Sequence, residues 1–492
     1  MDLPKGGCLW YIWFIMAEQS LKEKTAKGLF WGGLSNGAMQ VVGLVVGIIL
    51  LKFLSPDDYG IVGLLTIFSG IASTIQESGF TMALVNRSGF KHEDYNAVFW
   101  FNVIVGWGLY LILFLLAPCI AAFYGKPELV SLSRFSFLSF AVASMGIAHN
   151  ALLMKELKVK ERSEADIIAI SLSGVIAILL ALKGYGYWTL VIQQFVYTSS
   201  WSLLRWRFSL WRPTFHWDMR PLKEMFSFSL KLLFSSIITQ VHANIFSVLL
   251  GKFNTVANVG YFAQGTKWAN MGSMLINGMV SGVAQPVFVE VQAERERLVQ
   301  VFRKLLRFVS FVSFPLMLGL AFVGQEFIGM INSDWLPSVP ILQMYCVAGA
   351  FAPIQVLYSQ LIVSQGRSDF YFWCTILYAC AQIGVACWAL RYGIYWMACA
   401  NMLVSFIYLG VWHLFAGRVL SICLWAVLKD IAPYLIIVSI CFGCAWAALY
   451  AVDNNFLRFF GKIMISALLY VGAMWKLDSV VFKESVRFFI KK

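Results

Sequence analysis

The sequence predicts an all-α membrane protein of about fourteen transmembrane helices, arranged as two six-helix lobes followed by two extra C-terminal helices. Three observations predict this fold: a very apolar composition, a regular series of long apolar stretches, and an internal repeat. Of the 492 residues, 60% are hydrophobic and only 13% are charged, and the mean hydropathy is +0.74. A soluble core could not hide so many apolar side chains in a chain of this length. We therefore expect the chain to be embedded in lipid.

The apolar stretches are separated by short polar breaks. The predicted spans are 28–51, 60–84, 97–117, 129–153, 165–182, 187–204, 227–250, 261–286, 306–324, 338–363, 370–390, 394–413, 430–451 and 457–475. The predicted organisation is an N-terminal segment (1–27), a first lobe (28–204), an inter-lobe linker (205–226), a second lobe (227–413), an amphipathic linker with the last two helices (414–476), and a basic tail (477–492).

The internal repeat groups these spans. The stretch KFLSPDDYG at 52–60 returns as KFNTVANVG at 252–260, and the same offset matches Ser35 with Ser235, Gln40 with Gln240, and Leu50 with Leu250. No gap is needed, so the chain consists of two homologous halves. Because each half has an even number of predicted spans, both should enter the membrane from the same side. We expect parallel repeats about an axis along the membrane normal.

The distribution of positive charge predicts the orientation. Most of the 38 Lys and Arg residues fall in gaps on one side of the predicted spans, so both termini and the 205–226 linker should be cytoplasmic. That linker mixes Trp and Phe with Arg and Lys, which is typical of a segment lying along the inner membrane surface. The net charge of +13 does not indicate nucleic acid as a partner, because the basic residues lie between apolar runs rather than on a polar basic face.

The first sixteen residues, MDLPKGGCLWYIWFIM, contain an apolar run too short to span a bilayer, which needs about 20 residues. A signal peptide would require a small-residue cleavage site, and none follows. We favour the reading that Met16 opens an ordinary start and that residues 1–15 are an extension or an over-early start.

The stretch Ser55–Pro56–Asp57–Asp58 predicts a helix start. Serine can cap the helix, proline suits the first helical position, and carboxylates favour the positive end of the helix dipole. A catalytic pair of aspartates is the alternative, but the spacing favours the helix start.

Sequence motifs do not indicate a cofactor. The ten cysteines are scattered, mostly within apolar runs, and show neither CxxC nor metal-type spacing, so we expect small free hydrophobic residues. There is no GxxxxGK[ST] stretch, so ATP is not expected to be the direct energy source.

Ionisable residues inside predicted spans are functional candidates, because a charge at the bilayer centre costs at least about 2.5–3.5 kcal/mol. Those we single out are Arg134, Lys231, Lys267, Glu77 and His242. Lys231 and His242 share one helical face with Ser235, and Glu77 shares one with Thr66, Gly70 and Ser73. Such stripes can equally be packing interfaces, Lys231 and Arg134 can snorkel to the membrane surface, and a lone histidine is more often a packing residue.

Three cations and one carboxylate leave the predicted membrane interior net positive. Such a cavity favours an anionic substrate, and phosphate is the anion that Arg and Lys bind best. We therefore assign Arg134, Lys231 and Lys267 to an anionic head group. With no ATP site, a proton or ion gradient is left as the energy source, and Glu77 and His242 could change protonation during a cycle.

The sequence also resembles a known family, through KTAKGLFWGGLSNGAMQ, ILLKFLSPDDYGIVGL, ESGFTMALVNR and NAVFWFNVIVGWGLYLILFLLAPCIAAFYGKPEL, and more weakly through YWTLVIQQ. These stretches are similar to the polysaccharide transporter branch of the multidrug/oligosaccharidyl-lipid/polysaccharide (MOP) exporter superfamily, the Wzx-type flippases. The resemblance implies two lobes around a central cavity in the bacterial inner membrane. It also implies translocation of an undecaprenyl-diphosphate-linked oligosaccharide for capsule, O-antigen or exopolysaccharide assembly, with lipid, a polysaccharide polymerase and chain-length machinery as partners, and no enzymatic activity.

The family uses cationic residues against the diphosphate at positions that vary, so only this role is carried over, to the three cations named above. The first span departs from the more cationic cavities of some relatives, since it has no charge between Lys27 and Lys52. Two rivals remain. A multidrug exporter of the same superfamily would favour an acidic cavity. A membrane glycosyltransferase or polysaccharide ligase would need larger outer loops than the longest outer gap, 325–337, which holds only Glu326 and Asp334.

Overall fold

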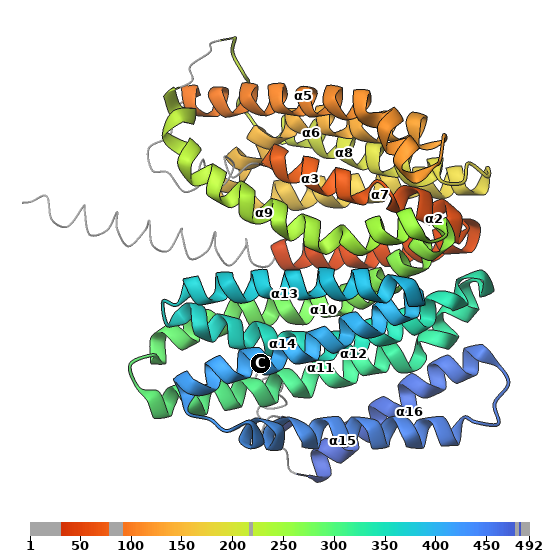
Figure 1. Ribbon diagram of the computed structural model, residues 1–492, viewed down its shortest axis with the longest axis vertical. Helices are drawn as coiled ribbons and strands as arrows, with labels where there is room; N and C mark the ends of the chain where they lie inside the picture. Colours follow the sequence, from red (N-terminus) through yellow and green to blue (C-terminus); the bar gives the residue numbers. More distant parts are fainter. Residues whose placement is uncertain (1–30, 78–91, 216–219, 478–481, 484–492) are drawn as a thin grey trace, which may run out of the picture. The chain divides into compact units, whose positions relative to one another are not determined.

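The structure is a computed structural model, and it describes residues 31–77, 92–215, 220–477 and 482–483. The expected N-terminal segment 1–27 and most of the basic tail 477–492 lie outside these residues. Within the described ranges every regular element is a helix. The chain divides into two compact units, 1–244 and 245–492 (Figure 1). Both this division and the expected start of the second lobe at residue 227 fall inside one helix, α9 (Arg220–Phe253).

The first unit begins with the helix Trp31–Phe53, which is followed by two short helices that are bent by 42° relative to each other. Its further elements are α2 (Pro56–Gly63), α3 (Thr66–Glu77), α5 (His92–Tyr124), α6 (Leu129–Lys155), α7 (Val159–Leu182), α8 (Trp188–Phe208) and the first part of α9 (Arg220–Phe253). Within this unit α6 is central, since it packs against both α5 and α8.

The second unit contains the end of α9 and the rest of the chain. Its elements are α10 (Val256–Val291), α11 (Arg295–Ile331), η1 (Ser333–Ser338), α12 (Val339–Ser364), α13 (Ser368–Ala389), η2 (Leu390–Tyr392), α14 (Ile394–Leu420), α15 (Leu424–Ala448) and α16 (Asn455–Lys476). Here α12 is central and packs against α10, α11 and α14. The last two helices, α15 and α16, lie beside α11 (Figure 1).

Small residues allow the central helices to approach their neighbours closely. A Cβ added to Gly146 of α6 would lie 2.6 Å from Trp201 of α8. In the second unit, a Cβ added to Gly349 of α12 would lie 2.6 Å from Met317 of α11. Helix association in lipid depends on such close packing, because lipid tails give no hydrophobic drive between helices.

The predicted helix start at Ser55 is confirmed. The Ser55 hydroxyl accepts a hydrogen bond from the Asp58 backbone N–H, the Asp58 side chain accepts one from the Ser55 backbone N–H, and Pro56 occupies the first turn. The corresponding position of the second half is also a cap, where Thr255 accepts a hydrogen bond from the Asn258 N–H. The aspartates therefore serve as helix-start residues, as favoured over a catalytic role.

Eleven described helices are long and apolar enough to cross a membrane, or up to twelve if α2 and α3 form one bent span. The all-helical membrane fold is thus confirmed, whereas the fourteen-span count and the parallel-repeat arrangement stay predictions. The long helices α8 and α9 do not belong to the eleven. Both carry many polar residues, such as Gln193 and Gln194 on α8 and Gln240 and Asn244 on α9, which lower their hydropathy.

The expected linker at 205–226 is shorter than predicted, because α8 continues to Phe208 and α9 begins at Arg220. Its described part, 209–215, packs against the start of α5. The Trp211 ring lies 5.9 Å from the Phe99 ring, and the Trp100 indole N–H donates to the Thr214 carbonyl at 2.8 Å. Phe215 is 96% exposed, so it remains available for the membrane surface on which the linker is predicted to lie.

Candidate functional site

Helices α3 and α9 approach each other closely at Gly70. A Cβ at Gly70 would lie 3.0 Å from the Gln240 side-chain oxygen and 3.3 Å from the Asn244 side-chain nitrogen. The hydroxyl groups of Thr66 and Ser73 donate to carbonyls of their own helix segment, at Gly63 and Gly70 respectively. Of the polar stripe predicted for this span, Gly70 thus lies against α9, while the Thr66 and Ser73 hydroxyls are used in local bonds to the backbone.

The predicted coupling residues lie on these two helices. Glu77 is the last residue of α3, and Lys231 lies in the first half of α9; the side chains of both are outside the described part of the structure. His242 is half-buried on α9. It lies two residues from both Gln240 and Asn244, so helical geometry turns it about 160° away from the face that contacts Gly70.

Arg134 lies on α6 and is half-buried. Its guanidinium stacks on the Phe114 ring of α5, at 4.3 Å from the ring centroid. The buried Nε of Arg134 has no hydrogen-bond partner among the described residues. The ring holds the cation in place, and its positive charge can attract an anion.

Lys267 lies in the second unit on α10, and its side chain is exposed. It belongs to an exposed stripe that we call the α10 polar face, defined by Lys267, Asn270, Met274, Gly278, Ser281 and Gln285. The residues follow one another at intervals of three or four, so they lie on one side of the helix. Only Lys267 was singled out from the sequence. The other polar members of this face, Asn270, Ser281 and Gln285, could have been identified by their helical spacing from Lys267.

The neighbouring side of α10 is exposed as well but apolar, with Leu275 48%, Met279 65% and Val283 53% exposed. This apolar side suits lipid. Polar side chains facing lipid are costly, so the α10 polar face favours contact with water or a polar ligand. Among the predicted site residues, Arg134, Lys231, Glu77 and His242 belong to the first unit and Lys267 to the second. The shared cavity predicted for the three cations stays a prediction.

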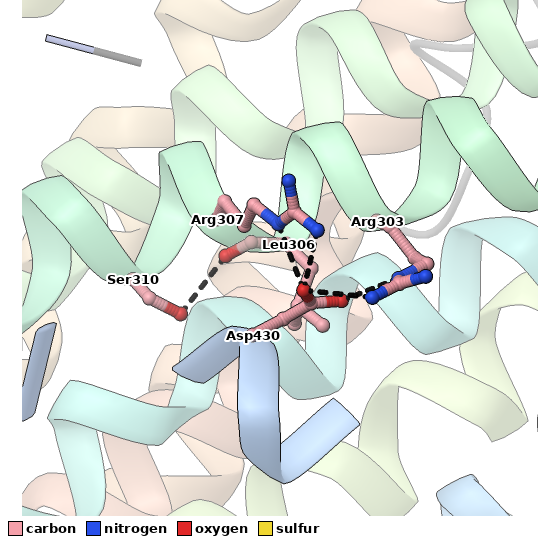
Figure 2. Close-up of polar contacts among 5 residues, drawn as sticks. All are labelled: Arg303, Leu306, Arg307, Ser310 and Asp430. Atoms are coloured by element: carbon pink, nitrogen blue, oxygen red, sulfur yellow. Dashed lines mark hydrogen bonds and ion pairs between the residues drawn. The ribbon is translucent and has the colours of Figure 1, made fainter. Parts of the chain in front are cut away.

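Two ionic clusters that sequence reasoning missed attach the last two helices to α11. Figure 2 shows Asp430 of α15 between Arg303 and Arg307 of α11, with Arg303 Nε at 2.6 Å and Arg307 Nε at 2.8 Å from its carboxylate oxygens. Near the other end of α11, the Lys462 ammonium of α16 donates to Glu326 at 2.5 Å. Glu326 was expected in an outer gap, but it lies within α11, which continues to Ile331.

The described residues contain no group of three or more His, Cys, Asp or Glu side chains that could hold a metal ion. The described cysteines are all free thiols. The candidate residues described above are cationic and polar side chains on membrane helices, and such side chains can bind an anionic or polar ligand.

Comparison with known proteins gives the family. The model of the family described as "Polysaccharide biosynthesis protein" matches residues 49–340. The teichuronic acid biosynthesis protein TuaB of Bacillus subtilis (strain 168) is 27% identical over 362 residues, which cover 72% of this chain and 74% of TuaB. The succinoglycan biosynthesis transport protein ExoT of Rhizobium meliloti (strain 1021) is 25% identical, covering 75% of this chain and 74% of ExoT.

Solved structures show the same fold at low sequence identity. The lipid II flippase MurJ in an inward closed conformation matches with a TM-score of 0.70 at 14% identity, covering 92% of this chain and 99% of the MurJ chain. An inward-facing multidrug resistance MATE family transporter of the MOP superfamily matches with a TM-score of 0.63 at 17% identity, covering 79% of this chain and 96% of the transporter. The expected resemblance is thus confirmed: the chain belongs to the polysaccharide biosynthesis protein family, whose Wzx-type members are membrane transporters with a MOP-type fold and not enzymes.

Proposed function

We propose that this protein is a flippase that moves an undecaprenyl-diphosphate-linked oligosaccharide from the cytoplasmic to the outer leaflet of the bacterial inner membrane. The α10 polar face carries this proposal. A lipid-linked oligosaccharide has a polar, negatively charged head that cannot enter hydrocarbon alone, and it needs a polar path with cationic contacts. The α10 polar face offers hydroxyl and amide groups for sugars and the Lys267 ammonium for a phosphate.

Arg134 supports the same substrate from the first unit, since its guanidinium is held on the Phe114 ring and carries a positive charge that favours an anion. Lys231 is proposed as the third cation. The sign of these charges favours an anionic substrate over the cationic drugs of a multidrug exporter. The names of the relatives, including the lipopolysaccharide biosynthesis protein WzxC of Escherichia coli (strain K12), support polysaccharide assembly as the process that uses the transported unit.

We further propose alternating access between two parallel repeats within the fourteen-span, two-lobe organisation given above, with both termini in the cytoplasm. Substrate would enter from the inner leaflet, its polar head would bind the cationic and polar side chains named above, and its polyprenyl tail would stay in lipid. Glu77 and His242 are proposed to bind the coupling proton or ion. A polysaccharide polymerase and its chain-length machinery are the proposed recipients of the flipped unit.

The charge assignment is tested by the affinity of the purified full-length protein for undecaprenyl diphosphate, which carries the head-group charge without the sugar. Arg134→Gln and Lys267→Gln should each weaken binding by about tenfold, because each removes a charge-assisted hydrogen bond. The matched control is Lys183→Gln, an exposed lysine at the C-terminal end of α7, which should bind as wild type does. Unchanged affinity of the triple variant Arg134→Gln/Lys231→Gln/Lys267→Gln would refute the assignment.

A further inference from the structure

The junction between α11 and α15 holds more positive than negative charge. The buried carboxylate of Asp430 is contacted by Arg303 through Nε at 2.6 Å and Nη2 at 3.0 Å, and by Arg307 through Nε at 2.8 Å and Nη2 at 2.6 Å (Figure 2). Two guanidinium groups against one carboxylate leave a net charge of about +1. These bonds use Nε and Nη2. Among the described residues none accepts a hydrogen bond from the Nη1 groups of the two arginines, so these donors can serve another anion.

The three side chains differ in exposure. Asp430 is 4% exposed, whereas Arg303 is 35% and Arg307 is 43% exposed. The carboxylate is thus an internal anchor that fixes both guanidinium groups from behind, while their outer edges stay accessible. Fixing two long side chains in advance lowers the entropy cost of binding a ligand.

The junction lies where α11 leaves the hydrocarbon. With 37 residues, α11 is about 55 Å long, well beyond the roughly 30 Å of a bilayer core. Its first turns carry the basic residues, and its apolar run begins after Arg307. Exposed apolar side chains occur close by along the same two helices, at Phe308 on α11 and at Leu424, Trp425 and Leu428 on the first turns of α15. Helical geometry turns them about 100° or more away from the charged faces, so they suit the surrounding hydrocarbon.

We propose that Arg303 and Arg307 bind the phosphate of an anionic membrane phospholipid at the α11–α15 junction, with Asp430 as the residue that positions them. The planar guanidinium matches phosphate oxygens in a paired geometry, and half-exposed arginines at a membrane boundary face the head-group layer. The exposed side chains of Phe308, Leu424 and Leu428, on other sides of the same helices, show that these turns border hydrocarbon, where a phospholipid's acyl chains would lie. Trp425, 74% exposed, suits the interface between chain and head group.

This site is separate from the proposed transport residues, because none of Arg134, Lys231 or Lys267 contributes to it. It gives the last two helices a role, since a lipid bound at the junction contacts both α11 and α15. The ligand class is a phosphodiester head group attached to acyl chains, and the test separates it from free phosphate.

The decisive variant is Asp430→Asn in the full-length protein, titrated with dioleoylphosphatidylglycerol and followed by native mass spectrometry. The substitution adds one positive charge but removes the anchor, so we expect binding to weaken by about fivefold. Binding that is unchanged or tighter would overturn the proposal, because it would mean that overall charge alone attracts the lipid. Dioleoylphosphatidylcholine should bind at least about tenfold more weakly to wild type; equal binding of the two lipids would also overturn it.

A second variant removes both arginines and the Asp430 charge, so that no unpaired carboxylate stays buried. The triple variant Arg303→Gln/Arg307→Gln/Asp430→Asn should lose about tenfold in affinity for phosphatidylglycerol. The control Arg295→Gln/Arg297→Gln lies on the first turn of the same helix and removes more net positive charge, yet should change affinity less than about twofold. Equal losses in both variants would refute a specific site. Displacement of the lipid by millimolar inorganic phosphate would assign the arginines to a free anion and refute the lipid.

Discussion

The buried pair between Lys462 and Glu326 gives the sharpest stability prediction. The Lys462 ammonium lies 2.5 Å from Glu326 Oε1, and the two side chains are only 9% and 8% exposed. The same ammonium lies 4.4 Å from the centre of the Phe322 ring. Lys462→Met keeps the length and apolar surface of the side chain but leaves the carboxylate buried without its counter-charge. Removing one partner of a buried pair costs about 3–5 kcal/mol.

The second oxygen of Glu326, Oε2, has no hydrogen-bond partner among the described residues. Among the described residues no other group would stabilise the Glu326 carboxylate after Lys462 is lost, which places the expected cost at the upper part of that range. Replacing both partners by neutral groups is often nearly neutral for stability. The double variant Lys462→Met/Glu326→Gln should therefore recover most of the loss.

The assay is thermal unfolding of the detergent-solubilised full chain, followed by the loss of the monodisperse peak in size-exclusion chromatography. Lys476→Met, an exposed lysine at the C-terminal end of α16, is the matched control and should unfold as wild type does. The reasoning is refuted if Lys462→Met unfolds at the temperature of this control, or if the double variant is as unstable as the single one.

Two further predictions concern helix geometry. Ser55→Ala removes the hydroxyl that accepts the Asp58 N–H at 3.2 Å, so the same unfolding assay should show a loss of about 1 kcal/mol, and Ser55→Asp should retain the cap; equal losses would contradict the capping role. Gly70→Val places a branched side chain where a single added Cβ would already lie 3.0 Å from Gln240 Oε1, so α3 and α9 should separate. Proteolysis of the intact Gly70→Val protein should therefore be faster than proteolysis of the control Gly108→Val. At Gly108 an added Cβ meets no neighbour within 4 Å. Equal proteolysis of the two glycine variants would contradict the close approach.

The parts of the fold that depend on local pattern could be predicted from the sequence. Composition gave the membrane class, and the Ser55–Asp58 stretch predicted its helix start because a cap needs only four consecutive residues. Helix lengths were harder to predict. The span expected at 306–324 is the apolar part of α11, whereas the helix runs from Arg295 to Ile331 because it continues beyond the hydrocarbon.

The ionic clusters could not be predicted in the same way. Arg303 and Asp430 are far apart in the sequence. Hydropathy alone does not show which residues of two helices face each other when the helices pack in lipid. Arg303 and Arg307 were counted for orientation only as basic residues on the cytoplasmic side of the predicted spans. The structure pairs both with the buried carboxylate of Asp430. Lys267 was identified by its charge, whereas uncharged members of the α10 polar face such as Asn270 required a search for polar residues at helical spacing.

The central claim is that the protein moves a phosphate-bearing glycolipid head across the membrane. The direct measurement uses vesicles containing the purified protein and a labelled undecaprenyl-diphosphate-linked oligosaccharide, with the accessibility of the label to a membrane-impermeant reagent followed over time. We expect the labelled glycolipid to exchange rapidly between leaflets with wild-type protein and slowly with the Arg134→Gln/Lys267→Gln variant. Exchange no faster than in protein-free vesicles, under an imposed proton or sodium gradient of either direction, would contradict it.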